Sequence, residues 1–162
     1  MSQEVHGLQN GQCLRDEFRQ YEINGKKYYV VAEIKKGHYT RVYFDGELVA
    51  ELPVASKGAE NMLLGLCEDW VKTFERGIAS CAQKGQETVF PSKEGYRLKY
   101  VAGDRIYAYV DGYEVDSYYY ANGDEPVYNT YEPTVLGFLK ARFEADKMAE
   151  QLKEKENRQL GR

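Results

Sequence analysis

A short pattern of glycine, tyrosine and aspartate occurs twice in this 162-residue chain. Residues 37–49 align without gaps on residues 103–115, and five of the thirteen positions are identical. The identical pairs are Gly37/Gly103, Tyr43/Tyr109, Asp45/Asp111, Gly46/Gly112 and Val49/Val115. Further along, Leu64-Gly65-Leu66 matches Leu136-Gly137-Phe138. Because a repeated segment is typical of a repeated structural unit, we expect an internal duplication.

Each copy predicts an antiparallel β-meander. Asn24-Gly25 and Asp45-Gly46 interrupt runs of apolar and aromatic residues, and these dipeptides favour tight hairpins in which both turn residues have positive φ. The strands expected in the first copy are residues 18–23, 28–34, 39–44 and 48–52. Those expected in the second copy are residues 88–90, 96–101, 106–110 and 113–120, with Asp111-Gly112 as the last hairpin turn.

One long helix follows each meander. In the first copy, apolar residues recur at helical spacing up to residue 82, with Ser56 suited to the N-cap and Gly85 to the C-terminal stop. In the second copy, Pro133 is suited to a first helical turn. We therefore predict an α+β fold, an internally duplicated antiparallel β-meander of about four strands followed by one helix. Residues 1–85 form the first repeat and residues 86–162 the second, within one compact domain.

Alternation along the strands predicts which side chains face the helices. Ile106, Ala108 and Val110 form an apolar set, so Tyr107 and Tyr109 are expected on the opposite, helix-distal face. The first copy repeats this arrangement, with tyrosines on the face away from its helix. Such a face either packs against the other sheet or contacts a partner.

Composition and motifs exclude several classes of protein. The net charge of −4 disfavours direct binding of nucleic acid, and no apolar run reaches the length of a membrane span. The N-terminal residues lack the features of a secretory signal, so we expect a soluble, cytoplasmic protein. The chain lacks the common catalytic and cofactor-binding motifs, so we expect no enzymatic activity, no cofactor and no metal site. Cys67 falls on the apolar stripe of the first helix and is expected to be a buried thiol.

Residues 104–132 carry the most information about function. They hold seven acidic residues against one basic residue, Arg105, and eight of the fifteen tyrosines of the chain. An ordinary solvated sheet face with a polar insertion would have the same composition. The alternative is a protein-binding surface, because interfaces are enriched in tyrosine. The residues expected to contact a partner are Tyr107, Tyr109, Asp111, Tyr113, Glu114, Asp116, Tyr118, Tyr119, Tyr120, Asp124 and Glu125.

An acidic surface attracts a basic partner, and many basic protein surfaces hold nucleic acid. The first functional hypothesis is therefore a non-enzymatic protein that binds a basic protein surface. Its narrower version is a nucleic-acid mimic that inhibits a nuclease or defence effector, of the anti-CRISPR or anti-restriction type that phages and mobile elements carry.

A second hypothesis is a small-molecule or nucleotide-binding module. The tyrosine faces of the two repeats would then hold a planar ligand, with Arg41, Tyr43, Arg105 and Tyr109 as the contacting residues. The strand edges expected at residues 18–23 and 118–120 would also allow two copies to pair, so a homodimer is compatible with the sequence.

Overall fold

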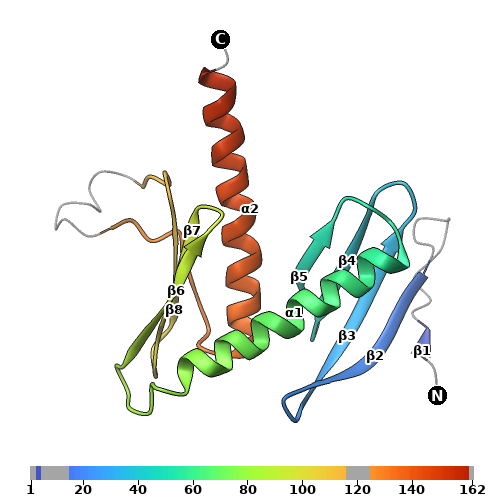
Figure 1. Ribbon diagram of the computed structural model, residues 1–162, viewed down its shortest axis with the longest axis horizontal. Helices are drawn as coiled ribbons and strands as arrows, with labels where there is room; N and C mark the ends of the chain where they lie inside the picture. The colour runs from blue at the N-terminus through green and yellow to red at the C-terminus, as the bar shows by residue number, and fades with distance from the viewer. Residues whose placement is uncertain (1–2, 5–14, 116–124, 161–162) are drawn as a thin grey trace. The chain divides into compact units, whose positions relative to one another are not determined.

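The computed structural model describes residues 3–4, 15–115 and 125–160 (Figure 1). The chain divides into two compact units, Met1–Phe74 and Glu75–Arg162. The division falls inside the first helix, α1 (Lys57–Ile78), whereas the sequence repeat divides after it, at residue 85. Each unit contains one antiparallel sheet and is described by itself.

The first unit contains a five-stranded sheet in the order β1-β2-β3-β4-β5. Its strands are β1 (Gln3–Glu4), β2 (Arg15–Ile23), β3 (Lys26–Lys35), β4 (Tyr39–Phe44) and β5 (Glu47–Leu52). The expected meander is confirmed, and β1 adds a short strand that was not predicted. It pairs with β2 at Glu17 and Phe18, so of the edge expected at residues 18–23 it covers only Phe18.

Helix α1 crosses one face of this sheet (Figure 1). Val42 and Phe44 of β4 are fully buried, as are Cys67 and Val71 of α1. This burial confirms the alternation expected along β4, which turns its tyrosines away from the helix, and the buried position of Cys67. Ser56 caps the helix by accepting a hydrogen bond from the Ala59 amide at 3.0 Å.

The second unit contains a four-stranded sheet in the order β6-β7-β8-β9. Its strands are β6 (Glu87–Lys93), β7 (Tyr96–Val101), β8 (Ile106–Val110) and β9 (Asn129–Tyr131). The second helix, α2 (Val135–Leu160), contacts β7, β8 and β9. The rings of Phe90 and Phe138 pack 4.6 Å apart in the core, and both side chains are buried. The predicted α+β class, with a meander followed by a helix in each half, is therefore confirmed.

The fourth strand of the second sheet was predicted at the wrong place. Residues 113–115 are not in a strand, residues 116–124 lie outside the described residues, and β9 supplies the fourth strand instead. The reason is the turn after β8. At Asp45-Gly46 both φ angles are positive (49° and 86°), which is the hairpin geometry. At the second turn only Gly112 has positive φ (81°), and the Tyr113 amide donates to the Val110 carbonyl at 3.1 Å. This is the pattern of a type II turn, which does not match the twist of paired strands.

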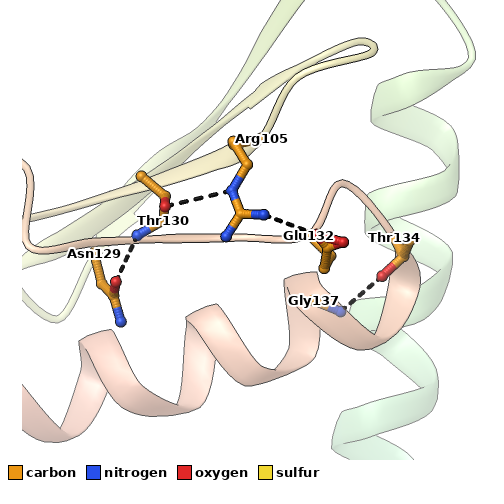
Figure 2. Close-up of polar contacts among 6 residues, drawn as sticks. All are labelled: Arg105, Asn129, Thr130, Glu132, Thr134 and Gly137. Atoms are coloured by element: carbon orange, nitrogen blue, oxygen red, sulfur yellow. Dashed lines mark hydrogen bonds and ion pairs between the residues drawn. The ribbon is translucent and has the colours of Figure 1, made fainter.

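The helix ends also differ from the prediction. Helix α1 ends at Ile78 and does not reach residue 82, so Cys81 lies beyond it. The Ser80 hydroxyl donates to the Gly77 carbonyl, and this local bond competes with continuation of the helix. Gly85 does not stop the helix, because the helix has already ended at Ile78. The Gly85 amide instead donates to the Ala102 carbonyl at 2.8 Å. In the second helix Pro133 precedes the cap, and Thr134 accepts the Gly137 amide at 3.0 Å (Figure 2).

Candidate partner-binding surface

The helix-distal face of the second sheet carries two tyrosines beside two cations. Arg97 of β7 pairs with Tyr109 of β8, and Lys99 pairs with Tyr107. The intervening residues Leu98 and Ala108 are buried toward α2. Because side chains alternate along a strand, these four residues point to the opposite face. We call this set, Arg97, Lys99, Tyr107 and Tyr109, the tyrosine platform.

The rings of the platform are held by their neighbours. The Arg97 guanidinium carbon lies 4.4 Å from the centre of the Tyr109 ring, and the Lys99 Nζ lies 5.6 Å from that of Tyr107. Both distances are in the range of cation–π attraction. The Tyr107 hydroxyl donates to Asp104 Oδ2 at 2.6 Å, and this bond is the main cause of a raised pKa for Tyr107. Two aromatic side chains are therefore positioned at a partly exposed surface.

Acidic residues border the platform, and arginines pair with two of them. Glu125 forms an ion pair with Arg97, and Glu132 forms one with Arg105 at 2.7 Å (Figure 2). The Arg105 Nε also donates to the Thr130 hydroxyl at 3.4 Å. A strongly acidic face was expected because the charges were counted only for residues 104–132. The face itself carries both signs of charge, because β7 adds Arg97 and Lys99.

The other predicted contact residues lie elsewhere in the same unit. Asp111, Tyr113 and Glu114 line a cleft of about 730 Å³ beside α2, on the helix side of the sheet end. The structure therefore brings Tyr107, Tyr109 and Glu125 together and separates them from this second group. Asp116, Tyr118, Tyr119, Tyr120 and Asp124 lie outside the described residues.

Several tyrosines of the acidic segment and its neighbours are structural. Tyr131 is buried and donates to Glu144 of α2 at 2.7 Å. Burial is the main cause of the raised pKa of Tyr131, and the bond to Glu144 adds to it. Burial likewise raises the pKa of Tyr96 to about 12, although Arg142 opposes the shift. Tyr128 packs edge-on against Tyr113, with 5.3 Å between the ring centres. Part of the high tyrosine content therefore serves the contact between sheet and helix.

The residues of the ligand hypothesis are distributed over the two units. In the first unit, Arg41 pairs with Glu51 at 2.6 Å and lies 3.8 Å from the centre of the Tyr39 ring. Tyr43 donates to Glu33 at 3.2 Å. Arg105 and Tyr109 belong to the second unit, in the contacts given above. The same combination of cation and tyrosine thus occurs on the helix-distal face of each sheet.

Arg97 and Lys99 were not predicted from the sequence, although a signal was present. They alternate with Leu98, which places them on the face of Tyr107 and Tyr109 once the hairpin register is known. Met148 and Leu152, which line the cleft, were not predicted as contact residues either. Their spacing of four residues places them on one side of α2.

Comparison of the chain with the models of known protein families, with curated proteins and with solved structures finds no match.

Within the described residues, neither helix is long and apolar enough to traverse a lipid bilayer. In the same part of the chain, His, Cys, Asp and Glu form no group of three or more that could hold a metal ion.

Proposed function

We propose that this chain is a non-enzymatic binding protein, and that the tyrosine platform of its second unit contacts a protein with a basic surface. The observation that carries the proposal is the placement of Tyr107 and Tyr109 side by side under cations from the neighbouring strand. Tyrosine and arginine are the residue types in which protein interfaces are enriched.

The contacts within the platform favour binding by reducing its entropic cost. A free tyrosine or arginine side chain loses conformational freedom when a partner immobilises it. Here Arg97 is already held by Glu125 and Tyr109, and Tyr107 is held by Asp104. A partner therefore meets side chains that are ordered before association, as in the rigid aromatic contacts of other binding surfaces.

The basic character of the partner is supported by the carboxylates that remain exposed. Asp111 and Glu114 lie at the end of the same sheet, outside the platform. Both are exposed, and the described residues provide no ion-pair partner for either of them. Carboxylates at such positions accelerate association with a basic surface rather than supply most of the affinity. Inhibition of a nucleic-acid-binding effector is a special case, in which the basic surface that is covered is the one that holds nucleic acid.

The proposal is tested by identifying proteins captured by the immobilised full chain and measuring the affinity of the purified candidate. The test variant is Tyr107→Thr with Tyr109→Thr, because threonine retains a high strand propensity. The matched control, Tyr39→Thr with Tyr43→Thr, makes the same change on the first sheet. We expect the test variant to lose about tenfold or more in affinity. Equal affinity of the test variant and the unchanged chain would contradict the proposal.

The charge of the partner is tested separately by neutralising the exposed carboxylates. Asp111→Asn with Glu114→Gln should slow association and weaken its dependence on salt, while dissociation changes little. An association rate that does not respond to these changes or to salt would show that the partner surface is not basic.

A further inference from the structure

The cleft beside α2 is built from two turns that are fixed to each other. The Glu94-Gly95 turn joins β6 to β7, and the Asp111 amide donates to the Gly95 carbonyl at 2.8 Å. A Cβ at Gly95 would lie 3.5 Å from the Ala149 Cβ, so this turn also packs closely on α2. Tyr113 is held in turn by its edge-on contact with Tyr128. The walls of the cleft are therefore formed without a ligand.

Apolar side chains of α2 form the floor of the cleft. They stay uncovered there because α2 is longer than the sheet that it covers. Its 26 residues span about 39 Å, whereas the six residues of β7 span about 20 Å. The C-terminal part of the helix therefore extends past the end of β7, as Figure 1 shows. Met148 and Leu152 are half-buried at this point and face the cleft. Methionine is a flexible side chain that adapts to the shape of an apolar partner.

Charges of opposite sign stand on the two sides of the cleft. The turn side provides the carboxylates of Asp111 and Glu114. The helix side provides the ammonium groups of Lys153 and Lys155, together with the Glu156 carboxylate. A ligand that matches this rim carries a cation toward the turn and an anion toward the helix, with an apolar group between them.

We propose that the cleft binds a protein segment that presents one aliphatic side chain between a basic and an acidic residue. The aliphatic side chain packs on Met148 and Leu152, the basic residue pairs with Asp111 or Glu114, and the acidic residue pairs with Lys153 or Lys155. A segment of a larger protein fits better than a small molecule, because the cleft is open to solvent. Small-molecule sites bury most of their ligand. This site goes beyond the tyrosine platform, which lies on the other face of the sheet.

A defined peptide tests the cleft without knowledge of the natural partner. The probe is the acetylated and amidated peptide Gly-Arg-Leu-Glu-Gly, added at millimolar concentration to the full chain with labelled methyl groups. We expect the NMR signals of the Met148 and Leu152 methyl groups to shift and to saturate. A peptide with serine in place of leucine should bind about tenfold more weakly, because it lacks the apolar contact. Absence of shifts at both methyl groups, or equal binding of the serine peptide, would overturn the proposal.

Two pairs of variants locate the binding. Leu152→Glu should abolish the Met148 shift, whereas Gln151→Glu places the same charge on an exposed neighbouring position and should preserve it.

Asp111→Lys with Glu114→Lys should weaken binding of the same peptide. Glu150→Lys with Glu154→Lys reverses two charges of α2 outside the cleft lining and serves as the control. If both charge reversals weaken binding equally, the peptide responds to net charge and the proposed pairing is wrong. The tyrosine platform is unchanged in all four variants, and its own test changes only Tyr107 and Tyr109. A failure of peptide binding therefore leaves the proposed contact of the platform standing.

Discussion

Gly137 and Glu132 approach each other so closely that no larger residue fits at position 137. A Cβ on Gly137 would lie 2.0 Å from the carbonyl oxygen of Glu132. The close approach arises because the chain turns sharply between β9 and α2, where Thr134 caps the helix (Figure 2). The same junction holds Glu132 within reach of Arg105. The glycine therefore determines how the second helix joins its sheet.

Replacing Gly137 with alanine should destabilise the second unit. The added methyl group cannot avoid backbone atoms, and overpacking of this kind costs about 3 kcal/mol. Gly65→Ala is the control, because a Cβ there meets nothing within 4 Å. It should stabilise α1 by about 1 kcal/mol. Urea unfolding followed by circular dichroism measures both changes, and equal stability of the two variants would contradict the assigned contact.

The two Asp-Gly turns should respond differently to loss of the aspartate. Asp45 has a φ of 49° and accepts the Tyr29 amide at 3.0 Å, so Asp45→Ala should cost about 1 kcal/mol. Asp111 does not have positive φ, so Asp111→Ala should change the free energy of unfolding by less than about 0.5 kcal/mol. Denaturant midpoints provide the measurement. A larger loss at Asp111 than at Asp45 would show that the two turns are not as different as their φ angles indicate.

The cap of the second helix should depend on a hydroxyl group. Thr134→Ala removes the acceptor for the Gly137 amide and should cost about 1 kcal/mol. Thr134→Ser keeps the acceptor and should restore most of this stability. Thermal unfolding of the three proteins distinguishes the cases, and a serine variant as unstable as the alanine variant would rule out the capping role.

Stability should fall at alkaline pH because of buried tyrosine. The pKa of Tyr96 rises from 10.0 to about 12 on folding. Between these values the unfolded chain releases the proton and the folded chain keeps it. The contribution is therefore complete below pH 10 and is lost as the pH rises toward 12. The slope for this group is about 1.4 kcal/mol per pH unit. Urea midpoints measured across this interval should decline less steeply in Tyr96→Phe than in the unchanged protein, and parallel declines would contradict the assignment.

Local patterns in the sequence were sufficient for most of the fold. Asn24-Gly25 and Asp45-Gly46 predicted two hairpins because their geometry depends on the turn residues alone. Alternation predicted the buried set of Ile106, Ala108 and Val110, because the pleat of a strand fixes which side chains share a face. These features require no knowledge of distant parts of the chain.

Features that depend on distant residues could not be predicted in the same way. β9 pairs with β8 across a long connection, so no turn signal marks it. The cations of the tyrosine platform come from β7, outside the segment that appeared most informative. The matched residues Gly65 and Gly137 also differ in place, since they lie in the third turn of α1 and the first turn of α2. A similar tripeptide therefore did not mark an equivalent position.

The turn after β8 has a consequence for how this protein can vary. A two-residue hairpin fixes the number of residues between its strands. Strands β8 and β9 are instead joined by a longer connection, since β8 ends at Val110 and β9 begins at Asn129. Insertions or deletions in that connection do not shift the pairing of Ile106 with Tyr131. The entropy of closing a connection grows slowly with its length, so doubling the number of residues adds only about 0.6 kcal/mol. Variants of this chain that are lengthened or shortened between these two strands should therefore keep the same sheet and the same tyrosine platform.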